Sequence, residues 1–147
     1  MSASKNLING YRTIVSDFTA MLQNWPQSNL EKTMPDGTTT YRQVLVRAIR
    51  SNYDLLELMQ KTAGVPRMPA PEAVATLGQL DMDKMRRMLD FLGPYANEAF
   101  SAMADEKLNG RTLTYQGSKY TIQQAMDAAS EALRDAKDKI QQAEQQH

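Results

Sequence analysis

The amino-acid sequence predicts an all-α fold, an up-down bundle of four main helices that forms a single domain over residues 1–147. Four long segments carry apolar residues at every third or fourth position, which is the spacing of an amphipathic helix. Glycine and proline separate these segments, and threonine-led capping signals open two of them. A chain of 147 residues has the size of one domain with one hydrophobic core.

The first predicted helix runs from about Ser4 to Trp25, and Pro26 ends it. The residues expected at the centre of its apolar stripe are Leu7, Tyr11, Ile14, Phe18, Met21 and Trp25. The residues expected on the flank of that stripe are Ile8, Val15 and Leu22.

The second predicted helix follows a loop over residues 26–39. Pro35–Gly37 is a turn signal, because proline presets its own φ and glycine permits a positive φ, so a short β-hairpin or an extended turn precedes the helix. The helix starts at Thr40, which forms a capping box with Gln43, and Gly64 closes it. Its apolar face consists of Tyr41, Val44, Leu45, Ala48, Ile49, Leu55, Leu56 and Met59.

The third predicted helix spans about Asp81 to Glu106, after a proline-rich connector and a short helical turn at Pro71–Leu77. Gly93 and Pro94 lie in its middle, where proline removes a helical hydrogen bond, so the helix is expected to kink or to split in two. Its apolar stripe consists of Met82, Met85, Leu89, Leu92, Ala96, Ala99, Phe100 and Met103.

The fourth predicted helix follows a second small hairpin, whose turn is Gln116-Gly117. It begins at Thr121 with another capping box, to Gln124. Its stripe consists of Ile122, Met126, Ala129, Leu133, Ala136 and Ile140. Residues 141–147 form a polar tail that is expected to fray.

The starts of the second and fourth helices share a pattern. Residues 40–48 read "TYRQVLVRA" and residues 121–129 read "TIQQAMDAA", and each follows a turn centred on glycine. Either the chain consists of two related helix–hairpin–helix halves, or the two helices share only their capping chemistry.

The composition narrows the classes of function. Lys plus Arg and Asp plus Glu both number 17, and no run of four basic residues occurs, so nucleic-acid binding is not expected. The chain has no cysteine, which removes disulfides, thiolate metal sites and cysteine nucleophiles. No segment has the apolar length of a membrane span and the N-terminus lacks a signal-peptide core, so we expect no membrane partner and a cytoplasmic protein.

The stretch "LTYQGSKYTIQQAMDAASEALRDAKDKI", residues 113–140, resembles the last third of the bacterial DinB/YfiT-like bundle proteins. That family commonly has an aromatic-threonine strand, a glycine, a threonine-led helix start and a His-x-x-x-His helix. Its second helix carries another histidine. The resemblance implies a four-helix bundle whose histidines bind a divalent metal.

Carried over by register, the metal-ligand position of the second helix falls on Arg47, and those of the fourth helix fall on Ala132 and Ala136. The chain's one histidine is His147, in the polar tail. Alanine has no lone pair to offer and arginine is a permanent cation, so the resemblance implies a divergent member without a metal site or cofactor.

Four residues are candidates for a ligand pocket between the second and fourth helices: Arg47, Asn52, Ala132 and Ala136. A guanidinium at Arg47 suits a carboxylate or phosphate, although a plain surface arginine is the alternative. Asn52 lies within the apolar stripe of its helix, where its amide either fixes the register of the helices or lines a pocket. The two alanines would leave room beside it.

A row of carboxylates, Asp127, Glu131, Asp135 and Asp138, follows one face of the fourth helix. Such oxygen ligands suit Ca²⁺ or Mg²⁺. However, the row lies far around the helix from the apolar stripe, so a solvated face is the expected arrangement.

Methionine is concentrated in the third helix, at positions 82, 85, 88 and 103. These side chains either pack in the core or form an adaptable surface for a partner. The wide stripes of the first and third helices, with Ile8, Val15, Leu22 and Met88 in excess, predict an exposed apolar patch and hence a homodimer.

Two hypotheses about function remain. The first is a non-catalytic binding or interaction protein that has lost the metal site, with a small molecule or a protein as its partner. The second is a small-molecule binder or transferase-like enzyme with a remodelled, metal-free pocket. No nucleophile motif, phosphate loop or catalytic residue is identified.

Overall fold

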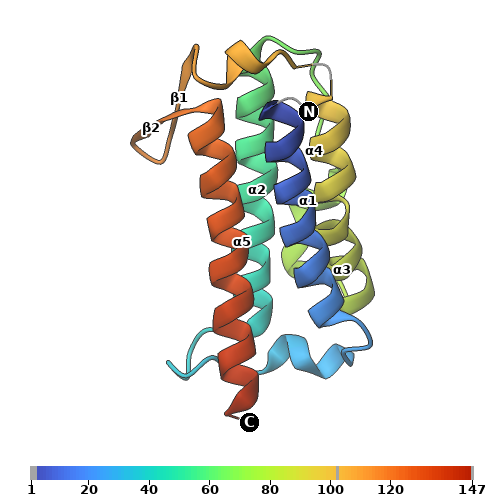
Figure 1. The fold of residues 1–147 in the computed structure, drawn as a ribbon. Helices are drawn as coiled ribbons and strands as arrows, with labels where there is room; N and C mark the ends of the chain where they lie inside the picture. The colour runs from blue at the N-terminus through green and yellow to red at the C-terminus, as the bar shows by residue number, and fades with distance from the viewer. Residues whose placement is uncertain (1–2, 102, 147) are drawn as a thin grey trace.

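The structure, a computed structural model, describes residues 3–101 and 103–146. This part of the chain is mostly helical, as predicted, and also contains a small two-stranded hairpin; its long helices lie side by side (Figure 1). The α-helices are α1 (Ala3–Leu22), α2 (Tyr41–Ala63), α3 (Met82–Asp90), α4 (Leu92–Phe100) and α5 (Ile122–Gln145). The strands are β1 (Thr112–Tyr115) and β2 (Ser118–Thr121), and short 3-10 helices are η1 (Gln27–Glu31), η2 (Glu72–Gln79) and η3 (Asp105–Leu108).

α1 buries a different stripe from the one expected at its centre. Ile8, Val15 and Leu22, predicted on the flank, are buried together with Tyr11 and Phe18. The residues expected at the centre that are only half-buried are Leu7, Ile14, Met21 and Trp25. Both stripes contain Tyr11 and Phe18 at helical spacing, so periodicity alone does not choose between them.

α2 begins and ends as predicted. The Thr40 hydroxyl accepts a hydrogen bond from the Gln43 amide at 3.2 Å, and the Gln43 side chain accepts one from the Thr40 amide at 2.9 Å. Gly64 caps the other end with φ +70°. The turn before α2 is extended and closes with a single β-bridge between Thr33 and Thr40, so among the described residues a full hairpin forms only before α5.

The third predicted helix is divided in two, as the glycine-proline pair indicated, with the break at Phe91. Pro94 has no amide hydrogen to offer the carbonyl of Asp90, four residues earlier, and the helix turns at this point. The prediction that the helix continues to Glu106 is wrong, because α4 ends at Phe100. The chain then bends back over the start of α1.

α5 follows a tight hairpin, in which Thr112 pairs with Thr121 and Tyr115 with Ser118. The turn residues Gln116 and Gly117 both have positive φ, 51° and 82°, as a type I′ turn requires. The prediction that residues 141–147 fray is wrong as far as Gln145, because α5 continues to that residue. Ala143 is buried there, and Glu144 pairs with Lys32 at 2.6 Å.

The burial of four methionines decides between core packing and an exposed partner surface, the two interpretations that the sequence left open. Met82, Met85, Met88 and Met103 are all buried within the single chain, so the core interpretation is confirmed and they form no exposed patch. Ile8, Val15 and Leu22 are buried as well, which removes the premise of the homodimer prediction. Among residues 3–101 and 103–146, the one large hydrophobic side chain that is clearly exposed is Phe91, at 37%.

Three tyrosine hydroxyls tie the core together. Tyr11 donates to Asn52 Oδ1 at 2.7 Å, Tyr53 donates to the Met88 carbonyl at 2.6 Å, and Tyr95 bonds with the Gln60 amide at 2.9 Å. Burial raises the pKa of Tyr11 well above its usual range. These bonds let polar groups lie inside the core without the cost of an unsatisfied donor.

No helix within the described part of the chain is long and apolar enough to cross a membrane.

Substitutions of Asn52 and Tyr11 are expected to have non-additive effects on the free energy of unfolding. Asn52→Leu removes the acceptor of a buried hydroxyl, so we expect about 2–3 kcal/mol loss of unfolding free energy in urea denaturation. The double variant Tyr11→Phe/Asn52→Leu is expected to lose less than the sum of the single variants, by about 1–2 kcal/mol. Exposed Asn9→Leu serves as the control. Strict additivity would show that the bond does not join the two helices energetically.

The first turn of α1 is capped from a distant part of the sequence. The Asp105 carboxylate accepts hydrogen bonds from the Ser4 and Ala3 amides, each at 3.1 Å, and these bonds lower the pKa of Asp105. A lowered native pKa stabilises the fold above the unfolded pKa and loses this effect as pH falls. We therefore expect Asp105→Asn to lower the thermal midpoint at pH 7, with the difference closing in strong acid. A difference that does not change with pH would contradict this account.

Candidate ligand site on the outer face of α2

The four residues predicted to line a pocket do not share any of the surface hollows found on the described part of the chain. Arg47 is exposed on the outer face of α2, Asn52 is fully buried, Ala132 is half-buried and Ala136 is buried. The amide of Asn52 accepts from Tyr11 and donates to the Ala48 carbonyl at 2.9 Å, so both bonds lie within the core. Neither the two hollows lined by Arg47 nor the hollow lined by Asp54 and Leu58 includes Asn52 or either alanine.

Arg47 instead lines a surface hollow of about 820 Å³ on the side of α2 that faces away from the core. Side chains of α2 form its floor, the turn before α2 and η2 border one end, and the tip of the β-hairpin borders the other. The lining residues are Thr38, Thr39, Arg42, Gln43, Val46, Arg47, Arg50, Ser51, Asp54, Gly78, Tyr115 and Gln116. The floor is therefore basic and polar, with three arginines and one aspartate.

The three arginines are not equivalent. The Arg42 side chain is already engaged within the protein. It donates hydrogen bonds to Glu31 at 3.0 Å and to the carbonyls of Leu80 and Gly78 at 2.6 and 3.2 Å. Within residues 3–101 and 103–146, neither Arg47 nor Arg50 forms a salt bridge or a side-chain hydrogen bond. Two guanidinium groups, one turn apart, are thus free to bind an anion.

The turn at the rim of the hollow is held rigid by Asp36. Its carboxylate accepts from the amides of Thr38 and Thr39 at 2.9 and 2.8 Å and from the Thr39 hydroxyl at 2.6 Å. These bonds, chiefly those from Thr39, lower the pKa of Asp36 to about 2. These hydrogen bonds hold the turn at the rim in one conformation, and they engage the Asp36 carboxylate within the turn itself.

The other end of the hollow is formed by Asp54 and Tyr115. Burial and the nearby charge of Glu57 raise the pKa of Asp54, while the charge of Arg50 lowers it. Burial raises the pKa of Tyr115, and the charge of Asp54 adds to this. Tyr115 reaches this position because β1 packs against α2.

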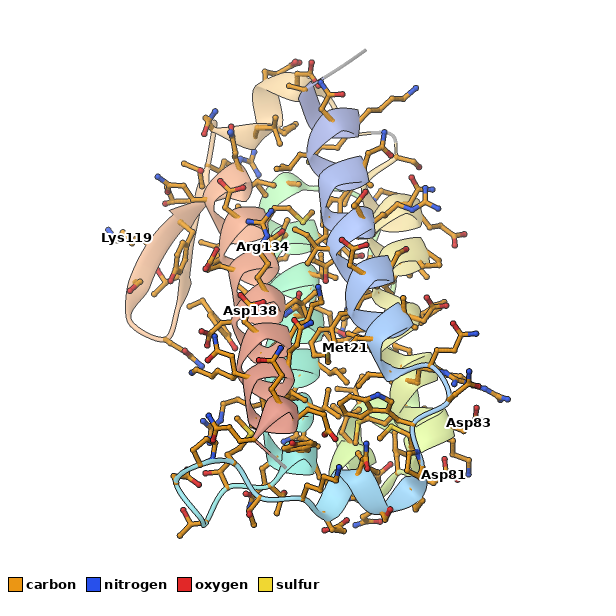
Figure 2. The ribbon with its side chains drawn as sticks, turned by 60° about the horizontal axis from the view of Figure 1, so that its bottom comes forward. Met21, Asp81, Asp83, Lys119, Arg134 and Asp138 are labelled. Atoms are coloured by element: carbon orange, nitrogen blue, oxygen red, sulfur yellow. The ribbon has the colours of Figure 1, made fainter. Side chains whose placement is uncertain are left out.

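The carboxylate row on α5 is solvated, as expected. Asp127, Glu131, Asp135 and Asp138 are exposed, and Figure 2 shows Asp138 and Arg134 on the outward side of α5. Lys139 pairs with Asp135 at 2.9 Å, and Arg134 approaches Glu131 at 3.9 Å. In the described part of the chain, no group of three or more His, Cys, Asp or Glu side chains is arranged to hold a metal ion. His147 lies outside the described residues.

Sequence reasoning identified Arg47 but missed Arg50, Asp54 and Tyr115. The signal for the first two is a polar stripe on α2, since Gln43, Arg47, Arg50 and Asp54 are spaced by four, three and four residues. Tyr115 gave no such signal, because its approach to α2 depends on how the hairpin packs.

The fold is similar to that of solved proteins. The chain superposes on the mycothiol-dependent maleylpyruvate isomerase with a TM-score of 0.70 and on a histidine-to-alanine mutant of that enzyme with a TM-score of 0.69, each at 16% sequence identity and over 93% of this chain. It spans 60% of the length of each of those chains. These similarities show that the chain shares the helical fold of that enzyme, in line with the fold that the DinB-like resemblance implied. No protein-family model and no curated protein sequence matches the chain.

Arg42 and Arg47 are expected to respond differently to truncation. Arg42→Ala breaks charge-assisted hydrogen bonds that join α2 to η1 and η2, so we expect a loss of about 1–3 kcal/mol in unfolding free energy. Arg47→Ala removes an exposed side chain without partners, so we expect a change within about 0.5 kcal/mol. Urea denaturation measures both. An equal loss in the two variants would contradict the division into a structural and a free arginine.

Proposed function

We propose that this protein binds small anionic molecules, without a metal, in the hollow on the outer face of α2. The observation that carries the proposal is the pair Arg47 and Arg50, which share one hollow and have no ion-pair partner among the described residues. The proposal keeps Arg47 in the binding role expected from the sequence and moves the site from the α2–α5 interior to the outer face of α2.

The chemistry of the lining supports a carboxylate or a phosphate as the bound group. A guanidinium presents several N–H donors in a fixed fork that matches both groups. Hydroxyls of Ser51, Thr38 and Thr39 lie in the same hollow and can add hydrogen bonds. Because the chain has no net charge, attraction of an anion depends on this local basic surface.

We further propose that the protein is a divergent, metal-free relative of the DinB-like proteins. It would be a four-helix bundle in which α3 and α4 together form one of the four helical columns. Arg47, Ala132 and Ala136, at the metal-ligand positions that the resemblance assigns, offer no metal-binding atom. The solved neighbour is named for an isomerase reaction that depends on mycothiol. We assign no catalytic residue here and favour binding, with a transferase-like or isomerase-like enzyme as the second candidate because of that fold.

Self-association and a cytoplasmic location remain predictions. The apolar residues once expected to drive a dimer are buried within the chain, so a homodimer would need a different surface. Light scattering at micromolar concentrations measures the oligomeric state directly.

Anion binding is expected to raise the thermal midpoint. A ligand at about ten times its dissociation constant stabilises the native state by about 1.4 kcal/mol, which corresponds to about 4 °C for a domain of this size. We expect such a rise with inorganic phosphate or citrate at constant ionic strength. The double variant Arg47→Gln/Arg50→Gln is expected to lose it.

The matched control is Arg134→Gln on α5, whose side chain is 59% exposed and lies outside the hollow. Phosphate and citrate also stabilise proteins nonspecifically, so the informative quantity is the difference between the two variants. An equal rise of the midpoint in the wild type and the double variant would overturn the proposal.

A further inference from the structure

We propose that the ligand is an elongated zwitterion, whose anionic group binds Arg47 and Arg50 and whose cationic group binds Asp54, with an apolar segment against Tyr115. This inference rests on the proposed function and names the class of ligand for the same site.

The first reason is the shape of the surface. A second hollow, of about 680 Å³, adjoins the first and shares Asp54 and Tyr115 with it. Its other lining residues are Glu57, Leu58, Lys61 and Arg67. The two hollows follow the same side of α2 from its first turns almost to its end, which suits a long ligand better than a compact ion.

The second reason is the spacing of the charges. Arg47, Arg50 and Asp54 follow one stripe of α2, so Asp54 lies about 6 Å along the helix from Arg50 and about 10 Å from Arg47, at 1.5 Å per residue. No salt bridge within 4.0 Å joins Arg50 to Asp54. The opposite charges are therefore both available, and their separation matches a carboxylate and an ammonium joined by a short alkyl chain.

The third reason is that Asp54 is the available carboxylate in the shared region. Glu57 is already engaged, since it accepts from the Ala70 amide at 2.9 Å and lies 3.8 Å from Arg67. Within the described residues, Asp54 has no hydrogen bond or ion pair. Burial and the charge of Glu57 disfavour its ionised form, and the charge of Arg50 favours it. An ammonium group bound there would offset that repulsion.

The fourth reason is the apolar surface beside Asp54. The half-buried ring of Tyr115 lines both hollows together with Asp54, and the half-buried Leu58, one turn further along α2, lines the second. An alkyl segment that ends at Asp54 would contact the Tyr115 ring and leave water. A purely ionic ligand would gain nothing from this ring.

The test uses three linear six-carbon acids: caproate, adipate and ε-aminocaproate. Caproate has one carboxylate, adipate has two, and ε-aminocaproate has one carboxylate and one ammonium. Isothermal calorimetry or an NMR titration of the full chain measures each dissociation constant at pH 7. We expect ε-aminocaproate to bind about two- to fivefold more tightly than caproate, and adipate more weakly than ε-aminocaproate, as expected for one partly exposed ion pair.

Asp54→Asn is expected to remove the advantage of ε-aminocaproate and to leave the affinity for caproate unchanged. Asp127→Asn, on the carboxylate row of α5, is the control and is expected to keep that advantage. Circular dichroism confirms that both variants are folded.

The outcomes separate the two proposals. If caproate binds through Arg47 and Arg50 but the ammonium adds no affinity, or if Asp54→Asn weakens both ligands equally, the zwitterion inference is overturned and the proposed function stands. If none of the three acids binds, the zwitterion inference is overturned, and the proposed function is decided by the phosphate and citrate measurement alone.

Discussion

The hydrogen bond from Tyr11 to Asn52, buried between α1 and α2, fixes how α2 is rotated in the fold together with the buried bonds of Tyr53 and Gln60. α1 and α2 make few direct contacts along their lengths, since both pack chiefly on α5 and on the α3–α4 column. The bond therefore adds a direct polar link between two helices that otherwise contact each other mainly through α5 and the α3–α4 column. A turn of α2 about its axis would leave a buried hydroxyl and a buried amide unsatisfied, at a cost of about 1–3 kcal/mol each. With the rotation fixed, the polar stripe Arg47, Arg50 and Asp54 faces outward.

Most of the local structure could be predicted because its causes are local. The capping boxes at Thr40 and Thr121, the glycine end of α2 and the break caused by Pro94 each depend on residues within one helical turn. The errors arose where distant packing decides. The centre of the α1 stripe and the helical tail near Ala143 depend on which neighbouring helices cover them, and these long-range contacts do not follow from local sequence patterns.

The site was predicted only in part for the same reason. Arg47 was identified through the resemblance and Asn52 through its polar character on an apolar face, but the structure places them on opposite sides of α2. The alanines at positions 132 and 136 suggested space, yet Ala136 is buried on the α5 side that packs against other helices. The hollow exists because the hairpin brings Tyr115 and Gln116 over α2, which is a long-range contact.

The central claim is that the outer face of α2 is a binding surface for an anion. The most direct measurement is a residue-by-residue map of backbone amide chemical shifts during titration with inorganic phosphate at constant ionic strength. The account predicts that the shifts concentrate in residues 38–54 and at the tip of the hairpin, near Gln116, and that they saturate. Shifts spread over all exposed basic residues without saturation, or shifts centred on the α5 row, would contradict it.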